Sequence, residues 1–162
     1  MLSRNIVLAM LALTAWVMTS YAGDTGAQGL KLAAAATLEN GRIQLSFALE
    51  NEGDLPVVIR RRDLPWEDPA NVIAVVVNKK TGIPLQRSTA IQDYFPTPET
   101  VRLSPKKDLR GTLSLDSYGQ LSPEQVTGGS FLVAWHYEAK NVEGRALGTF
   151  GGWLEVPSAK KK

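Results

Sequence analysis

The fold is decided most clearly by the stretch Ile43-Gln44-Leu45-Ser46-Phe47-Ala48-Leu49-Glu50, in which large apolar residues alternate with Gln, Ser, Ala and Glu. Successive side chains of a β-strand point to opposite faces, so a period of two predicts a strand with one buried and one solvated face. Such half-buried strands are typical of antiparallel sheets. The stretch therefore indicates a β-sheet protein.

The residues before this strand predict a hairpin. Asn40-Gly41 directly precedes it, and Asn-Gly is a strong signal for a two-residue turn because both residues tolerate positive φ. Upstream, every second residue from Leu30 to Leu38 is Leu or Ala. The run Ala33–Ala36 is also compatible with a helix, but the turn and the alternating partner favour a strand.

Further strands follow at short intervals, separated by turn residues such as Asn51-Glu52-Gly53-Asp54. They are predicted over Leu55–Arg60, Val72–Val77, Thr100–Leu103, Leu109–Leu115, Phe131–Tyr137 and Leu147–Val156. The apolar, β-branched run Val72–Val77 predicts a buried central strand. Eight or nine short strands with turns between them predict an all-β fold, an immunoglobulin-like antiparallel β-sandwich.

The N-terminus has the pattern of a cleaved signal peptide, residues 1–22. Arg4 forms a short basic region, residues 6–18 are almost entirely apolar, and Ser20-Tyr21-Ala22 places small residues at a cleavage site before Gly23. An uncleaved anchor is the alternative, but the apolar run is short for a membrane-spanning helix. The pattern predicts export, to the periplasm or out of the cell, with no membrane span after cleavage.

Cleavage would leave 140 of the 162 residues, enough for one domain with its own core. We predict a flexible leading segment over 23–29, the sandwich over 30–157 and a basic tail over 158–162. The chain contains no cysteine, which excludes disulfides and thiolate metal sites. Its 18 Lys and Arg residues against 16 Asp and Glu residues are mixed along the chain, so no nucleic-acid partner is expected.

The order of features in the second half resembles known secreted sandwiches. Those features are Val101-x-Leu103-Ser104-Pro105, alternating Leu109, Leu113 and Leu115, Tyr118-x-x-Leu121, Gly129, and Phe131-x-Val133-x-Trp135-x-Tyr137. Over about residues 40 to 140 the chain resembles the N-terminal sandwich domains of deuterolysin-type and peptidyl-Lys metallopeptidases, and is similar to small bacterial proteinase-inhibitor sandwiches. Those peptidases carry His-Glu-x-x-His in a following domain, whereas this chain has only His136. The resemblance therefore implies a sandwich that contacts another molecule, without protease activity.

The segment from Arg60 to Pro69 is the first candidate binding site. It combines Arg60, Arg61 and Arg62 with Trp66 and three acidic residues, and Trp and Arg are common anchors of protein interfaces. Pro65 and Pro69 would stiffen it. The alternative is structural: Trp66 plugs an open end of the sandwich and the arginines pair with the acids.

A second aromatic segment, with Tyr94 and Phe95, would extend this surface if it lay at the same end of the sandwich, and would otherwise cap the core. His136 is expected on the opposite face of its strand from Trp135 and Tyr137, without a catalytic partner visible in the sequence. In Phe150-Gly151-Gly152-Trp153 the glycines predict a bulge or a close approach of two backbones. No acidic cluster has metal-loop spacing, so neither a metal nor another cofactor is predicted.

These observations predict a non-enzymatic binding or accessory domain of the cell envelope or secreted space. Its partner would be an envelope or secreted protein. The alternative is a peptidase inhibitor or prodomain-like module that presents Arg60–Pro69 or Asp93–Pro98 to a peptidase. An enzyme is the third and weakest alternative.

Overall fold

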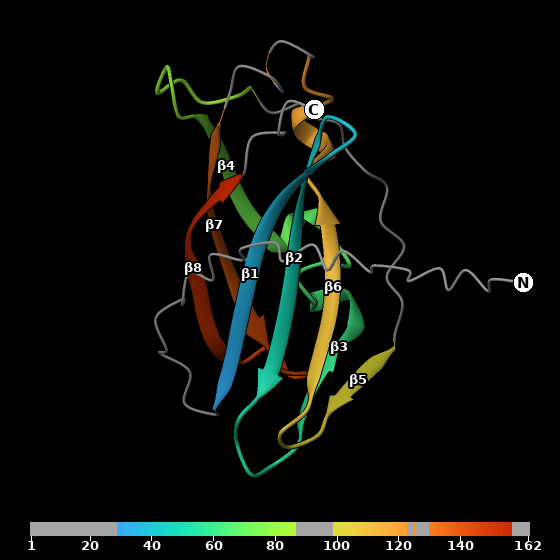
Figure 1. Cartoon of the computed structure of the whole chain (residues 1–162). Helices are drawn as coiled ribbons and strands as arrows, with labels where there is room; N and C mark the ends of the chain where they lie inside the picture. Colours follow the sequence, from blue (N-terminus) through green and yellow to red (C-terminus); the bar gives the residue numbers. More distant parts are fainter. Residues whose placement is uncertain (1–28, 87–98, 123–124, 126–129, 157–162) are drawn as a thin grey trace, which may run out of the picture.

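The predicted hairpin opens the fold, because β1 (Leu30–Glu39) pairs along its whole length with β2 (Arg42–Asn51). Asn40 and Gly41 have φ of 50° and 75°, as the turn requires. A computed structural model describes residues 29–86, 99–122, 125 and 130–156 of the chain (Figure 1). The predicted signal peptide, the segment with Tyr94 and Phe95, and the basic tail lie outside the described residues.

The described residues form eight strands and three short 3-10 helices. After β2 come β3 (Val57–Arg60), η1 (Arg61–Asp63), η2 (Pro69–Asn71), β4 (Val72–Asn78), β5 (Thr100–Leu103), β6 (Asp108–Ser114), η3 (Asp116–Tyr118), β7 (Phe131–Lys140) and β8 (Ala146–Val156). All strand pairs are antiparallel. The all-β prediction is therefore confirmed. No helix in these described ranges is long and apolar enough to cross a membrane.

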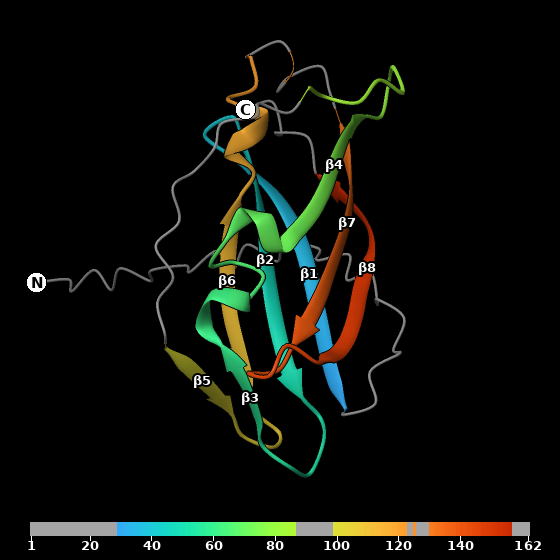
Figure 2. The ribbon, with the colours of Figure 1, turned by 180° about the vertical axis from the view of Figure 1, so that it is seen from behind.

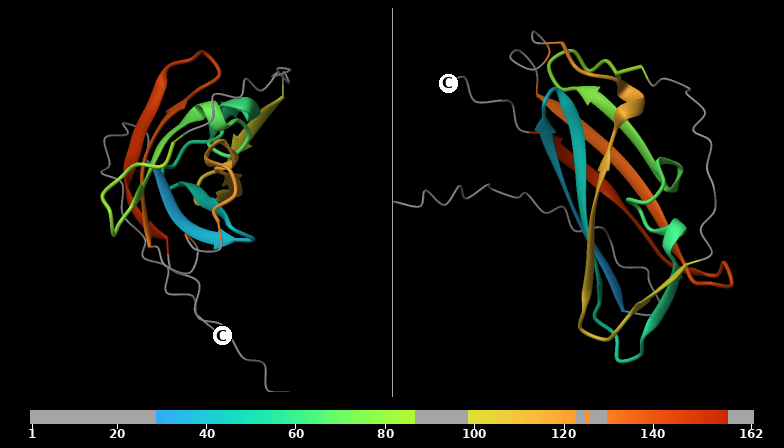
Figure 3. Two further views of the ribbon diagram at one scale, coloured as in Figure 1. Left: turned by 90° about the horizontal axis from the view of Figure 1, so that it is seen from above. Right: turned by 90° about the vertical axis from the view of Figure 1, so that its right-hand side faces the viewer.

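Two three-stranded sheets, β1-β2-β6 and β4-β7-β8, face each other, and β3 pairs with β5 in a small third sheet (Figures 2 and 3). In an immunoglobulin domain, strands A, B and E share one sheet and C, F and G the other. With β3 taken as an insertion, the order here matches A-B-E and C-F-G. The strand in the place of D, β5, pairs with β3 instead.

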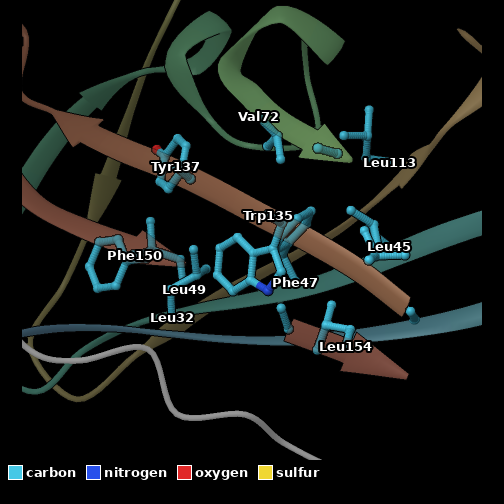
Figure 4. Close-up of a cluster of buried hydrophobic side chains, with 14 of the residues drawn as sticks. Leu32, Leu45, Phe47, Leu49, Val72, Leu113, Trp135, Tyr137, Phe150 and Leu154 are labelled. Atoms are coloured by element: carbon cyan, nitrogen blue, oxygen red, sulfur yellow. The ribbon is translucent and has the colours of Figure 1, made fainter. Parts of the chain in front are cut away.

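The core fills the space between the two larger sheets. Paired residues share a face, so Phe47 lies beside Gly111, Leu45 beside Leu113, and Val133 beside Leu154. Phe47, Trp135, Tyr137 and Phe150 form its aromatic centre (Figure 4). With no disulfide, this burial provides the main stabilisation of the fold.

One polar side chain, that of Asn51, is buried among the core residues. Asn51 is fully buried at the end of β2; its amide donates to the carbonyl oxygens of Leu55 (2.8 Å) and Leu103 (3.1 Å), and its side-chain oxygen accepts from the Gly53 N–H (3.0 Å). The amide thereby ties β2 to β5 and shapes the turn that leads from β2 to β3. The prediction of a turn at 51–54 is confirmed, but Asn51 itself belongs to the core.

The strand Val72–Val77 was expected at the centre of a sheet, and that expectation is wrong. In the described part of the chain β4 lies at the edge of the sheet β4-β7-β8. Its open side is partly occupied: the Tyr118 hydroxyl donates to the carbonyl oxygen of Ala74 (2.6 Å), and the Leu85 N–H donates to that of Val76 (2.8 Å). These bonds reduce the tendency of the edge to pair with another strand.

Candidate functional site

The first candidate site, Arg60–Pro69, is folded onto the body of the domain. Leu64 and Pro65 are buried. The side-chain amide of Asn71 donates to the carbonyl oxygens of Arg62 (2.6 Å) and Leu64 (2.9 Å). This one part-buried amide fixes the backbone of the segment at two points. The segment is therefore a fixed cover and not a projecting loop.

Trp66 faces inward from this segment. Its ring lies directly on Gly111 of β6, because a Cβ atom at Gly111 would stand only 2.1 Å from the Trp66 Cγ. Gly111 pairs with Phe47 and shares its inward face, so the indole closes the core beside β6. The structural alternative placed Trp66 at an open end of the sandwich, whereas the ring packs on the middle of β6.

The three arginines pair with nearby acids. Arg60 lies 3.4 Å and Arg62 3.6 Å from carboxylate oxygens of Asp63, and Arg61 lies 3.1 Å from both Glu67 and Glu99. Two hydrogen bonds raise the pKa of the Arg61 guanidinium; the bond to Glu67 has the larger effect and the bond to Glu99 the smaller. Each positive charge has a negative neighbour, so the cluster offers little net charge to an anionic ligand.

His136 stands on the outer face of β7, exposed, as its place in the sequence predicts. It lies between Ile73 on β4 and Gly151 on β8. A hollow of about 320 Å³ beside it is lined by Asp63, Ala70, Asn71, Ile73, His136, Glu138 and Lys140. Over residues 29–86, 99–122, 125 and 130–156, no group of three His, Asp or Glu side chains is placed to hold a metal ion.

A glycine of β8 lies where the backbones of β7 and β8 approach closely, as the sequence predicted. A Cβ atom at Gly151 would stand 2.7 Å from the carbonyl oxygen of Trp135, so the β7 and β8 backbones can be this close only at a glycine. Gly152 pairs with Trp135, which faces inward. Gly151 therefore allows β7 and β8 to approach closely.

Three large apolar side chains are exposed on the outer face of the sheet β4-β7-β8. Ile73 is 63% exposed, Val75 43% and Trp153 59%. The register aligns Val75, Ala134 and Trp153 in one row across the three strands. Leu132 and Val77 form the next row, half-buried. The name outer apolar face is used below for the surface formed by Ile73, Val75, Val77, Leu132, Ala134, His136, Gly151 and Trp153.

The outer apolar face was not predicted from the sequence, although part of its signal is present there. Phe131 to Tyr137 alternate inward, which places Leu132 and Ala134 outward, and Trp153 has the opposite parity to the buried Phe150 and Leu154. An apolar residue at an outward position on each of three strands points to an exposed patch. Recognising it requires knowing that β4, β7 and β8 are neighbours.

The opposite sheet has a different surface. An open hollow of about 560 Å³ lies on the outer face of β1-β2-β6, floored mainly by small side chains such as Ala33, Ala35, Ser46 and Ala48. A smaller hollow of about 190 Å³ adjoins it and is lined by charged side chains, among them Glu50, Asp108, Arg110, Lys31 and Lys106. Small residues offer no chemistry that selects a ligand, so this surface is the weaker candidate.

Comparison of the chain with protein-family models finds no match, and comparison with curated proteins finds no match either.

Proposed function

We propose that this protein is an exported, non-enzymatic binding domain that contacts its partner through the outer apolar face. One observation carries the proposal: three of the five large hydrophobic residues that are exposed in the described part of the chain lie together on this face. Single exposed hydrophobic residues are ordinary on soluble proteins, but a contiguous group marks an interaction surface.

The chemistry of the face suits binding. In the free protein Ile73, Val75 and Trp153 are exposed to water. A partner that covers them removes apolar surface from water, which favours binding by about 25 cal/mol for each Å². Trp is among the residues that contribute most to interfaces. Strands hold the three side chains in place, so little backbone order has to be gained on binding.

The export half of the proposal rests on the signal-peptide pattern of residues 1–22. The full chain, expressed in a host with a secretory pathway, should be recovered outside the cytoplasm with the intact mass of a chain that begins at Gly23. Recovery of the uncut chain from the cytoplasm would contradict export and leave the binding proposal standing.

The resemblance to proteinase-inhibitor sandwiches supports a module that contacts a protein, and peptidases are one class of partner that the experiment below tests. The inhibitor alternative for Arg60–Pro69 gains no support from its packing. Leu64 and Pro65 are buried and Trp66 lies on Gly111, so its apolar residues are already used inside the domain.

The binding proposal is tested with the purified protein as bait on envelope and culture-supernatant fractions. Trp153→Ala removes the aromatic anchor, and Leu55→Ala removes an exposed hydrophobic residue, 78% exposed, in the turn between β2 and β3. We expect wild type and Leu55→Ala to retain the same partner and Trp153→Ala to lose it at unchanged thermal stability. Equal retention by all three proteins would refute the assignment of the face.

A further inference from the structure

We propose that the open edge of β6 binds an extended segment of a partner protein, which adds to the sheet β1-β2-β6 as its fourth strand. This site is separate from the outer apolar face, which belongs to the other large sheet. Two features of β6 support it: the direction of its backbone hydrogen-bonding groups, and the half-buried apolar side chains beside them.

β6 forms an edge because the strand that would cover it pairs elsewhere. In an immunoglobulin domain one sheet contains strands A, B, E and D, with D beside E. Here β6 takes the place of E. The strand in the place of D, β5, diverges from β6 beyond their turn and pairs with β3 (Figure 3, right). In the described part of the chain, the sheet therefore ends at β6.

The backbone of β6 directs alternate residues toward β2 and away from it. The Leu115 N–H donates to the carbonyl oxygen of Ile43 (2.9 Å), and in an antiparallel ladder such bonds recur at every second residue. The residues of β6 that bond to β2 are those with inward side chains: Leu109, Gly111 and Leu113. The residues that point their N–H and C=O groups to the open side are the intervening ones: Arg110, Thr112 and Ser114.

These open-side groups are free to pair. Among residues 29–86, 99–122, 125 and 130–156, nothing hydrogen-bonds to the backbone of Arg110, Thr112 or Ser114. Arg110 and Thr112 are also exposed. A row of unpaired N–H and C=O groups is a template for another strand, whose backbone carries the same groups at the same spacing.

The other edges of the two large sheets are better protected. β1 and β8 lie beside each other where the sheets meet (Figure 1). On the open side of β4, the Tyr118 hydroxyl and the Leu85 N–H already donate to carbonyl oxygens. An added strand would have to displace these contacts, whereas at β6 it would form new bonds without breaking any between described residues.

The apolar side chains next to the β6 edge are incompletely covered. Leu109 and Trp66 pack against the core, yet both are only half-buried. Trp66 lies on Gly111, in the middle of β6. Neighbouring strands of a sheet lie about 4.8 Å apart, so the inward side chains of an added strand would contact Trp66 and Leu109. Covering them removes apolar surface from water, which favours association.

These features define the chemistry of the partner segment. Its inward residues are apolar, and the residues between them are polar because they lie on the outer face beside Arg110 and Thr112. The Arg110 side chain is 80% exposed, and within the described residues only its Nε forms a hydrogen bond, to Asp108 (2.6 Å). Its terminal amino groups therefore favour an acidic residue on the added strand. Main-chain bonds would supply affinity and this alternation specificity.

Amide hydrogen exchange of the full chain, followed by NMR, tests whether the edge is open. We expect slow exchange at Gly111 and Leu113, which bond to β2, and fast exchange at Arg110, Thr112 and Ser114. Slow exchange at these last three residues in the protein alone, at low or high concentration, would mean that the chain itself or a second copy fills the edge. That result would overturn the proposal.

The probe for binding is a fluorescent synthetic peptide in which valine alternates with threonine, with one central glutamate. We expect it to bind the full chain and to slow exchange at Arg110, Thr112 and Ser114. N-methylation of every second residue blocks one side of the peptide backbone, so methylating one alternate set should abolish binding and methylating the other should leave it. Equal binding by the two methylated peptides, or no binding by the unmethylated one, contradicts strand addition.

Thr112→Pro is the matched change in the protein. Proline removes the Thr112 N–H, which faces the open side, and leaves the bonds of Gly111 and Leu113 to β2 in place. We expect it to weaken peptide binding by about tenfold or more, and Thr112→Val, which retains the N–H, to bind like wild type. Equal binding by Thr112→Pro and Thr112→Val would overturn the site.

Two controls keep this test decisive. Thermal unfolding shows whether Thr112→Pro is folded, and if it is not, the methylated peptides decide the outcome on the wild-type chain. Trp153→Ala changes the outer apolar face and should bind the peptide like wild type. Loss of peptide binding in Trp153→Ala would place the peptide on the outer apolar face and refute the β6 site.

Discussion

Phe47 on β2 and Trp135 on β7 meet edge to face, with ring centroids 5.5 Å apart and ring planes at 70°. They join the two larger sheets at the centre of the core. β2 and β7 occupy the places of strands B and F, which antibody domains link by a disulfide. In this cysteine-free chain an aromatic contact occupies that position.

This contact predicts a large loss of stability for Phe47→Ala. Removing a buried aromatic ring leaves a cavity between the sheets and costs about 3–5 kcal/mol. Phe47→Leu retains most of the volume and should cost clearly less. Urea denaturation followed by tryptophan fluorescence measures both changes. Equal losses for the two variants would show that the edge-to-face ring contact, and not filled volume, dominates.

Gly111 and Trp66 are predicted to be energetically coupled. Gly→Ala in a strand normally gains about 0.5–1 kcal/mol, but here the added Cβ would collide with the indole and displace it from the core. We expect Gly111→Ala to destabilise wild type and to be neutral or stabilising in the Trp66→Ala background. A double-mutant cycle from denaturation midpoints gives the coupling, expected above about 1 kcal/mol. Additive effects would mean that Trp66 does not lie on Gly111.

Asn51 is predicted to be the most sensitive polar residue among the described residues. Asn51→Ala leaves the carbonyl oxygens of Leu55 and Leu103 and the Gly53 N–H without their side-chain partner. The bond to Leu103 is buried and the other two are part-buried. A buried group left unpaired costs about 1–3 kcal/mol, so the total loss should exceed about 2 kcal/mol. Gln44→Ala, which removes a part-buried bond to the Ser114 hydroxyl, serves as the control and should cost less than 1 kcal/mol, about the net value of one such bond. A mild effect at Asn51 would imply that the turn at 51–54 rearranges freely.

We expect the protein to lose stability at alkaline pH because the phenol of Tyr137 is buried. Burial, with a smaller effect from Asp63, raises the pKa of its phenol above the ordinary value of 10.0, and its hydroxyl donates to the carbonyl oxygen of Asp63 (2.9 Å). The unfolded chain then loses this proton first, so the contribution of Tyr137 to stability is complete below about pH 10 and falls as the pH rises further.

The comparison of Tyr137→Phe with wild type isolates this effect. Tyr137→Phe should be less stable at neutral pH by about 1 kcal/mol, the net value of one hydrogen bond, and should lose less stability above pH 10. Tyr118→Phe retains the Tyr137 phenol and should keep the alkaline loss of wild type. Denaturant unfolding from pH 8 to pH 11 measures the difference, and parallel curves for wild type and Tyr137→Phe would contradict it.

Several features could be predicted from the sequence because their causes are local. Asn40-Gly41 sets the β1–β2 turn by its own φ preferences, and the alternation of Ile43 to Leu49 sets which face of β2 is buried. The outward place of His136 follows from the same period of two. Each of these signals acts over a few neighbouring residues.

The candidate site could be predicted only in part. The sequence identified Trp66 and three arginines as a group, and it left open whether they bind a partner or support the fold. Their packing depends on Gly111, Glu99 and Asn71, and Glu99 and Gly111 lie far along the chain from Trp66. Local spacing carries no information on which distant residue meets a side chain.

By itself, then, the sequence determined that the chain forms antiparallel strands, which residues of each strand share a face, and that no disulfide supports the core. The tertiary structure decided which strands are neighbours. Strand order placed Val72–Asn78 at a sheet edge, turned Trp66 inward onto Gly111, and brought Ile73, Val75 and Trp153 onto one exposed surface. The physical reason is that the period of two is a property of one strand, whereas burial depends on what packs against each face, and that is decided by contacts between residues distant in the chain.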